Sequence, residues 1–364
     1  MANMNIRTPR FYVDYIQYLL SRGVAQNGEF DVTATGGSGA SAFRGIQTGS
    51  EAELFDGRPL NLVSFDTSGD TDSQVLVTLD MQSANPKQSF LAILNHNLNS
   101  ASGKIRLSAG DNSTDVTAVD AGNADTSDVS WNSGGATEVV NGDIITVASN
   151  NKSVVIQPAN DGTTIITFNE QDLRYWGVQF EGAGSGTGAA TDDTFSGSND
   201  LSIGQIMIGE FKDLQSPDLS VQRSIIFDQV KVQESLGGQR YSNMTNHGRS
   251  ASSTSKSPFT TSSSNRHLYG GRLAYDMNFS FLSSSEIMPT DYHIKDFDDD
   301  AVVEDIWNLT NGSGLPFIFS CDSTSSGDNS ESQHIFARFA QNSLDMQQVA
   351  LDTFNISLKL EEEF

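Results

Sequence analysis

The chain has 364 residues, a formal net charge of −25 at pH 7 and a pI of about 4.3. An acidic field of this size repels nucleic-acid phosphates and anionic lipids, so it disfavours genome binding and attachment to anionic membranes as the main task. At roughly 100–200 residues per domain, the length predicts two or three domains. The acidic composition fits a marine or moderately saline setting.

The cysteine count and the hydropathy pattern exclude further classes. Cys321 is the only cysteine, which excludes an intrachain disulfide and a cysteine-based metal cluster. We expect it to be a small core residue on the strand 317–321 and not a reactive thiol. The first thirty residues lack a signal-peptide pattern and no apolar run reaches 18 residues, so we expect synthesis in the cytoplasm and no membrane span.

The residue usage predicts a mainly β protein. Gly occurs 32 times and favours turns, while 21 Phe residues concentrate the apolar content in large side chains suited to cores. Near the N-terminus, the segment 7–20 predicts a strand that turns into a short helix closed by Gly23, and a Gly/Ser/Ala linker follows at 36–41. Residues 1–58 are therefore interpreted as an N-terminal arm and linker.

Residues 59–215 alternate between apolar and polar side chains, which predicts an antiparallel β-sandwich of the jelly-roll kind. No helix is expected between these strands, and this argues against a parallel sheet. The segment 111–135 is small and polar throughout and is predicted as an exposed loop. The predicted strands are 75–79, 90–94, 105–107, 144–147, 154–156, 164–168, 174–180 and 203–211.

Residues 216–364 predict a second β domain with one helix. Gly237 and Gly238 indicate a tight turn, and the Ser/Thr-rich segment 250–264 indicates a long flexible loop or an arm ordered by a partner. The alternation in 273–281 predicts a half-buried strand. The other predicted strands are 224–227, 230–233, 316–319, 335–339 and 354–362, the last of them tied into a sheet.

The helix of this second domain is expected over residues 300–311. Val302, Ile306 and Leu309 recur at the spacing of one helix face, and Gly312 suits the C-terminal cap. Carboxylates before the helix favour its N-terminal dipole.

Two acidic stretches have a spacing that suits a hard cation. Asp298, Asp299 and Asp300 are weak candidate metal ligands, but a charged helix start explains the same residues and is preferred. The segment 111–115 has the opening spacing of a calcium loop, yet it lacks Gly at the sixth place and Glu at the twelfth. We therefore expect no metal and no cofactor.

No enzyme motif is complete. The segment 184–189 matches a dinucleotide fingerprint, but no helix is predicted after it, so the anion site of that motif cannot form. No serine lies in a nucleophile elbow, although paired carboxylates distant in the chain would leave no local pattern. The histidines, which show no zinc-site spacing, are His96, His247, His267, His293 and His334. We expect a non-enzymatic protein; an enzyme acting on cell-wall or surface polymer stays as the weakest alternative.

Three C-terminal segments share an order with a known class of proteins. They are residues 218–220, the turn 237–241 and the terminal strand 354–362, with the helix and the Pro-Phe-Ile-Phe strand between the last two. This region resembles tail-tube and distal-tail proteins of tailed bacteriophages. The resemblance implies a tail-tube-like β domain and closure of six copies into a ring around the DNA channel.

The preceding region carries a second resemblance, at residues 92–98, 174–176 and 203–209. It is similar to a discoidin-like (galactose-binding-like) sandwich. Tyr175 and Trp176 are weak candidates for stacking on a glycan, and the preferred interpretation places them in the sandwich core.

The sequence thus predicts a structural component of a tailed-phage virion. We expect a distal-tail or tube-to-tip adaptor protein, a homo-oligomeric ring (a hexamer) that also contacts other tail proteins and is located in the virion after assembly in the host cytoplasm. The alternative is a virion module that binds carbohydrate or the host surface, such as a tail-tip adhesin or decoration protein, with a host glycan as partner. Neither interpretation includes specific binding of nucleic acid.

Overall fold

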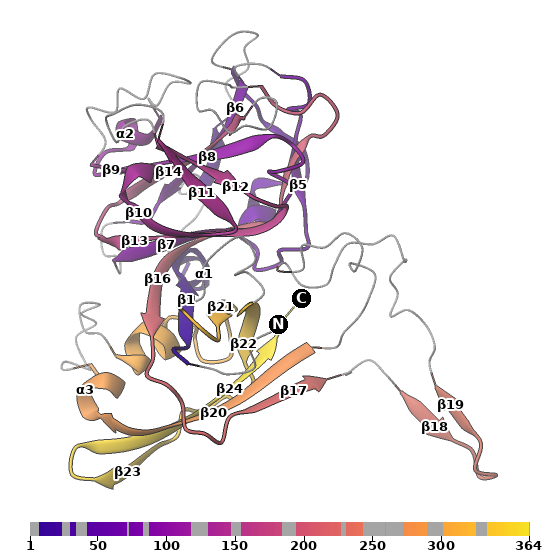
Figure 1. The fold of residues 1–364 in the computed structure, drawn as a ribbon, viewed down its shortest axis with the longest axis vertical. Helices are drawn as coiled ribbons and strands as arrows, with labels where there is room; N and C mark the ends of the chain where they lie inside the picture. Colours follow the sequence, from indigo (N-terminus) through magenta and orange to yellow (C-terminus); the bar gives the residue numbers. More distant parts are fainter. Residues whose placement is uncertain are drawn as a thin grey trace.

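The structure is a computed structural model, and it confirms the mainly β fold. It describes residues 7–23, 30–33, 42–70, 73–82, 87–117, 130–146, 154–183, 194–226, 231–242, 259, 272–289, 301–324 and 333–363. Among these residues every strand pairing is antiparallel except that of β3 with β6. Two lobes lie one above the other in Figure 1, with the sandwich strands in the upper lobe and β17 to β24 in the lower. No described helix is both long enough and apolar enough to cross a bilayer.

The upper lobe is the predicted antiparallel sandwich. One sheet has the order β11-β12-β8-β14-β6-β2, with β3 and β9 at its margins. Its strands are β2 Phe30–Thr33, β3 Ala42–Phe43, β6 Ser73–Asp80, β8 Gly103–Gly110, β9 Trp131–Asn132, β11 Gly142–Thr146, β12 Val154–Pro158 and β14 Tyr175–Gly182. The facing strands are β10 Ala136–Val140, β13 Gly162–Gln171, β7 Gln88–His96 and β16 Gln205–Asp213.

The upper lobe also contains a small third sheet and three short helices among its described residues. A three-stranded sheet, in the order β15-β5-β4, contains β4 Ile46–Thr48, β5 Val63–Phe65 and β15 Leu201–Ile203. The short helices are η1 Glu51–Phe55, α2 Ser113–Thr117 and η2 Ser133–Gly135. The predicted loop 111–135 is therefore wrong in part, because Ser113–Thr117 packs as a helical turn with Val116 buried.

The N-terminal strand lies inside the molecule. The expected strand and helix are confirmed as β1 Arg10–Asp14 and α1 Tyr15–Ser21. β1 pairs with β16 on one edge and with β21 (Phe317–Ser320) on the other. β16 pairs with β7 through its first half and with β1 through its second, so one sheet continues through both lobes. Residues 10–14 are thus a central strand and not an arm, while the domain boundaries at 58 and 215 stay predictions.

The lower lobe continues this sheet in the order β1-β21-β22-β24-β20-β17, with β23 added to β24. The terminal strand is paired as predicted. The bounds are β17 Gln222–Ile226, β20 Arg272–Ser283, β22 His334–Phe339, β23 Met346–Ala350 and β24 Thr353–Glu362, with a separate hairpin of β18 Val232–Glu234 and β19 Arg240–Ser242 and a short helix α3 Ser284–Ile287.

The expected helix of the lower lobe is present but shorter than predicted. Its described helical turn, η4 Val302–Asn308, is of the π type and not an α-helix over 300–311. The predicted apolar stripe holds, because Val302, Ile306 and Leu309 are all buried. Gly312 takes a positive φ of +62°, the backbone region that the predicted cap needs.

Three clusters of buried apolar side chains form the core of the molecule. The first fills the sandwich and reaches α1, and the second fills the lower lobe around Phe11 and Phe317. The third lies on the shared sheet and joins residues of both lobes, including Phe90 from β7 and Ile318 from β21. Phe259, the single described residue of the Ser/Thr-rich segment 250–264, is buried in this third cluster. The remainder of that expected loop or arm lies outside the described residues.

Candidate functional site

The exposed apolar side chains gather on the lower lobe. Of the twelve large apolar residues exposed in the described chain, nine lie between residues 219 and 351. They are Leu219, Ile225, Val232, Leu236, Tyr241, Phe281, Met346, Val349 and Leu351. Exposed apolar side chains concentrated on one part of a protein mark a contact surface.

The hairpin β18–β19 is the most exposed element of this lobe. Every residue from 231 to 242 is exposed, and the two strands pair only with each other among the described strands. Figure 1 shows the hairpin standing away from the body. Its turn is the predicted one: Gly238 donates its N–H to the Ser235 carbonyl over 2.9 Å, at a φ of +80°. An isolated two-stranded hairpin is marginally stable in water, so this one is suited to being completed by a partner.

The lower lobe also presents strand edges. β17 pairs with β20, and its other edge has no described partner. β23 is exposed along its whole length and pairs only with β24 among the described strands. Unpaired edges are templates for pairing with another chain, so these two edges and the hairpin are separate candidate elements for assembly.

Phe281 adds an irregular feature to the lower lobe. It is 79% exposed and has a φ of +64°, which is strained for a non-glycine residue. The register of β20 against β24 shifts between Phe279 and Leu282, and this bulge reverses the alternation. The predicted alternation of 273–281 therefore holds through the buried Phe279 and fails at Phe281. The Phe281 N–H donates to Asn355 Oδ1 over 3.1 Å, which fixes the bulge.

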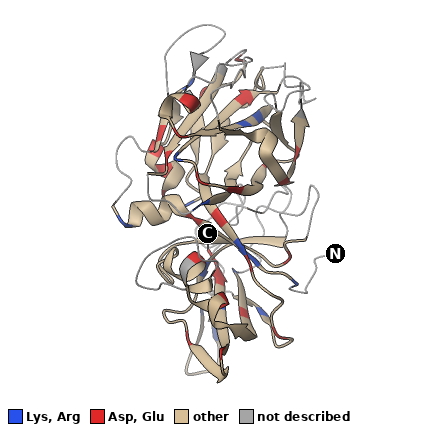
Figure 2. Ribbon diagram, turned by 90° about the vertical axis from the view of Figure 1, so that its left-hand side faces the viewer, with Lys and Arg blue, Asp and Glu red and all other residues tan. Residues whose placement is uncertain are grey.

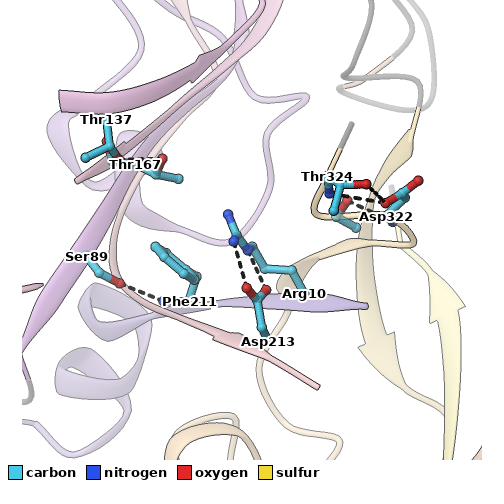
Figure 3. A network of polar contacts seen from close by, with 9 residues as sticks. Arg10, Ser89, Thr137, Thr167, Phe211, Asp213, Asp322 and Thr324 are labelled. Carbon is cyan, nitrogen blue, oxygen red and sulfur yellow. Dashed lines mark hydrogen bonds and ion pairs between the residues drawn. The ribbon is translucent and has the colours of Figure 1, made fainter. Parts of the chain in front are cut away.

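A polar network lies where the lobes meet. Arg10 donates two hydrogen bonds to Asp213, at 2.6 and 2.8 Å, and its guanidinium lies 4.0 Å from the centre of the Phe211 ring. Figure 3 shows this pair between Thr167 of the upper lobe and Thr324 of the lower. Asp213 and the ring face of Phe211 both bind the arginine. The network therefore connects β1 to β16 and is not an open ligand site.

A buried charge cluster lies on β8 and β14. Arg106 Nε donates to Glu181 Oε1 over 2.7 Å, and Lys104 Nζ lies 3.7 Å from the same carboxylate. All three side chains are nearly inaccessible to solvent. Burial opposes ionisation of Glu181, but Arg106 and Lys104 outweigh it and hold the pKa of that carboxyl below its ordinary value. The three charges therefore compensate one another inside the sandwich, at positions that period-two alternation alone would have placed in solvent.

The predicted glycan candidates fall into two environments. Trp176 is fully buried against Phe168 and Trp131, so it cannot stack on a sugar, and the preferred core interpretation is confirmed. Tyr175 is half-buried, and the Arg174 guanidinium lies 4.9 Å from its ring centre. Stacking by Tyr175 therefore competes with a contact already formed.

Of the predicted metal ligands and the cysteine, the structure describes only the cysteine. Asp298, Asp299 and Asp300 lie outside the described residues, as does the segment 184–189. Within the described chain, no group of three His, Cys, Asp or Glu side chains is arranged to hold a metal ion. Cys321 is buried in the lower-lobe core, as expected, and its Sγ lies 3.3 Å from Gln333 Oε1.

Comparisons with known proteins give solved structures of low similarity. No protein-family model and no curated protein matches the chain. Among solved structures, the chain is similar to chitosan-binding module 1 of a chitosanase/glucanase from Paenibacillus sp. IK-5, at 12% identity and a TM-score of 0.27, over 50% of this chain and 93% of that module. It is also similar to CBM32-1 of a family 31 glycoside hydrolase from Clostridium perfringens, at 10% identity and a TM-score of 0.28, over 50% and 95% of the two chains.

The fold and the exposed surface together define the architectural class of this protein. The molecule is a β-sandwich fused through one continuous sheet to a second β lobe, which presents a projecting hairpin and open strand edges.

Proposed function

We propose that this chain is a non-enzymatic structural subunit that assembles with copies of itself through the lower lobe. The observation that carries the proposal is the β18–β19 hairpin, whose Val232, Leu236 and Tyr241 are exposed on an element with no described contact to a core. Pairing of such a hairpin with a neighbouring copy buries apolar surface and satisfies strand edges at once.

The proposed setting is the tail of a tailed phage, as a distal-tail or tube-to-tip adaptor ring of six copies. The resemblance of residues 218–364 to tail-tube and distal-tail proteins motivates this setting. The charge distribution is compatible with it, because the Asp and Glu residues, red in Figure 2, are spread along the ribbon of both lobes, and their charges repel the DNA that passes through a tail.

Light scattering coupled to size exclusion tests the assembly. The full chain, of 39.2 kDa, is expected to give a concentration-dependent oligomer, with a mass near six copies at saturation. Replacing residues 231–242 by a short Gly-Ser linker is expected to shift the protein to monomer without lowering its melting temperature. The triple change of Val232, Leu236 and Tyr241 to Ser is expected to act in the same direction.

A change within the same hairpin serves as the control. Gln233→Ser alters an exposed polar side chain of β18 and is expected to leave the oligomer intact. A full chain that stays monomeric at every concentration and is absent from purified particles would sink the proposal. Placement of the chain in an electron-microscopy map of the virion decides its position in the tail.

Carbohydrate binding is the second candidate function. The observation that favours it is a pocket on the lower lobe, lined by one tryptophan and several amide side chains.

A further inference from the structure

A pocket of about 320 Å³ opens between the end of α1 and the turn that follows η4. Its volume is at the lower end of the range of small-molecule sites. Residues from three separate parts of the chain form it, among them Arg22, Trp307, Asn308, Asn311, Ser313 and Asn342.

The apolar wall of the pocket is an indole. Trp307 is half-buried, and its ring packs against Phe339 with 5.1 Å between ring centres. Gly312 lies beside it, and a Cβ at this position would meet Cζ2 of the indole at 3.4 Å. A side chain at position 312 would therefore lie against this edge of the ring. Trp131 and Trp176, by contrast, are buried in the sandwich.

The polar wall consists of amides and a hydroxyl in fixed orientations. Asn311 Nδ2 donates to Ser21 Oγ over 2.9 Å, while its Oδ1 accepts a bond of 3.4 Å from Arg22. Ser313 Oγ donates to Asn342 Oδ1 over 2.5 Å. The turn itself is closed by the Gly312 N–H, which donates to the Trp307 carbonyl over 2.9 Å. A site ordered before binding loses less entropy when a ligand enters.

The charge of the pocket differs from that of the whole chain. Among the described residues that line the pocket, Arg22 is the single charged side chain and none is a carboxylate, although the chain carries 46 Asp and Glu residues. Amides offer donors and acceptors side by side, which matches hydroxyl groups that do both. A sugar ring has one face of C–H groups and a rim of hydroxyls, so it fits an indole on one side and amides on the other.

We infer that this pocket is a carbohydrate site, in which the C–H face of one sugar residue lies on Trp307 and its hydroxyls bond to Asn308, Asn311 and Asn342. Arg22 adds a preference for sugars that carry a carboxylate. The site lies outside the sandwich and is independent of the assembly proposed above, so either proposal can fail alone.

A glycan array followed by titration of the full chain tests the inference. The probes are neutral oligosaccharides of glucose, galactose and N-acetylglucosamine, and acidic ones that contain uronic or sialic acid. At least one class is expected to bind saturably and to change the tryptophan emission, because Trp307 is the half-exposed tryptophan. Asn308→Ala and Asn342→Ala are each expected to weaken binding by about five- to tenfold, as for loss of one hydrogen bond.

Further variants separate the roles of the pocket residues. Trp307→Ala is expected to abolish binding and the emission change. Arg22→Gln is expected to weaken acidic glycans and spare neutral ones. Asn112→Ala, an exposed change on the sandwich, is the matched control and is expected to bind as the parent does. The variant with the hairpin replaced by a linker is also expected to bind, whatever its oligomeric state.

Two results overturn the inference. One is the absence of binding to every neutral and acidic probe by a folded parent protein. The other is binding that survives unchanged in Asn308→Ala and Asn342→Ala. Both positions are exposed, so the two variants are expected to keep the melting temperature of the parent.

Discussion

Asp14 is a buried carboxyl at the point where β1 becomes α1. Its Oδ1 accepts the Ile16 N–H over 3.0 Å and caps the helix, but no cation is among the groups that shift its titration. Burial outweighs these hydrogen bonds and raises the pKa of Asp14 from 3.8 to about 7. The folded protein therefore holds the proton over a range in which the unfolded chain has lost it.

The first prediction concerns the stability that this proton provides. Because the folded-state pKa is raised, the contribution of Asp14 is full below about pH 4 and is lost as the pH rises through 7. The free energy of unfolding of the parent, relative to Asp14→Asn, is expected to fall by as much as about 4 kcal/mol between these limits. Urea denaturation at several pH values measures it; a difference that stays flat would contradict the prediction.

His96 gives the free energy of unfolding of the parent the opposite pH dependence. Because His96 is present in both the parent and Asp14→Asn, its contribution cancels when the two proteins are compared. Burial lowers its pKa to about 4, so its contribution is present above its ordinary value of 6.5 and is lost as the pH falls through 4. The comparison with Asp14→Asn is needed because the two slopes have opposite signs between pH 4 and 6.5.

The second prediction concerns Glu181. Replacing it by Gln leaves Arg106 and Lys104 buried without their counter-charge, and we expect a loss of about 3–5 kcal/mol in the free energy of unfolding. The matched control is Asp276→Asn, which breaks the exposed pair with Lys359 and is expected to cost less than about 1 kcal/mol. Equal losses in the two variants would show that the buried cluster has no special role.

Residue-level interpretation from sequence succeeds for apolar side chains and fails for buried polar ones. The burial of Cys321 and Trp176 follows from apolar character in a predicted strand. Arg106 lies on the predicted strand 105–107, at a position that alternation assigns to solvent, yet it is buried. Alternation tells which face of a strand a side chain occupies, but not whether other chain covers that face.

For single elements, the sequence predicts strands and turns, but it does not predict which other parts of the chain lie against them. The turn at Gly237 and Gly238 follows from local backbone preferences, whereas the isolation of its hairpin depends on where the rest of the chain goes. The predicted strand 203–211 is two strands, β15 and β16, because the chain breaks its pairing at Gly204. A Cβ at Gly204 would lie 2.0 Å from the Pro59 carbonyl oxygen, which is a contact that no local pattern reveals.

The third prediction belongs to the bulge in β20. Phe281→Asn keeps a residue that tolerates positive φ and removes an exposed ring, so the free energy of unfolding is expected to stay constant or to rise by up to about 1 kcal/mol. Self-association is expected to weaken at the same time, if the ring contacts a neighbouring copy. Urea denaturation and light scattering of the same samples measure both; a clear loss of stability would show that the ring supports the monomer.

The whole molecule is organised by the sheet that crosses both lobes. Phe11 of β1 is buried against Phe317 and Phe319 in the lower lobe, while β1 itself also pairs with β16 of the upper lobe. A fold joined in this way is expected to unfold as one cooperative unit.

The fourth prediction tests that cooperativity. Phe11→Ala in the lower core and Phe168→Ala in the sandwich core are each expected to cost about 3–5 kcal/mol. Both are expected to shift the same single transition, seen identically by circular dichroism and by tryptophan fluorescence. Two separated transitions in either variant would mean that the lobes are independent domains.

The fifth prediction follows from the net charge of −25. Copies of the chain repel one another over a distance of about 10 Å at 0.1 M salt, and salt screens this repulsion. Self-association is therefore expected to strengthen between 50 and 500 mM NaCl, as measured by sedimentation velocity. Association that weakens with salt would indicate that opposite charges, and not apolar contacts, hold the copies together.

The passage of β16 from one lobe to the other has a mechanical consequence. Its backbone hydrogen bonds to β7 end where those to β1 begin, at Gly209. A force that separates the lobes acts along this strand, and it loads several bonds on each side in parallel instead of opening them one after another. A flexible linker would stretch under the same force. We therefore expect the two lobes to move as one rigid body, so that a displacement of the lower lobe is transmitted to the sandwich.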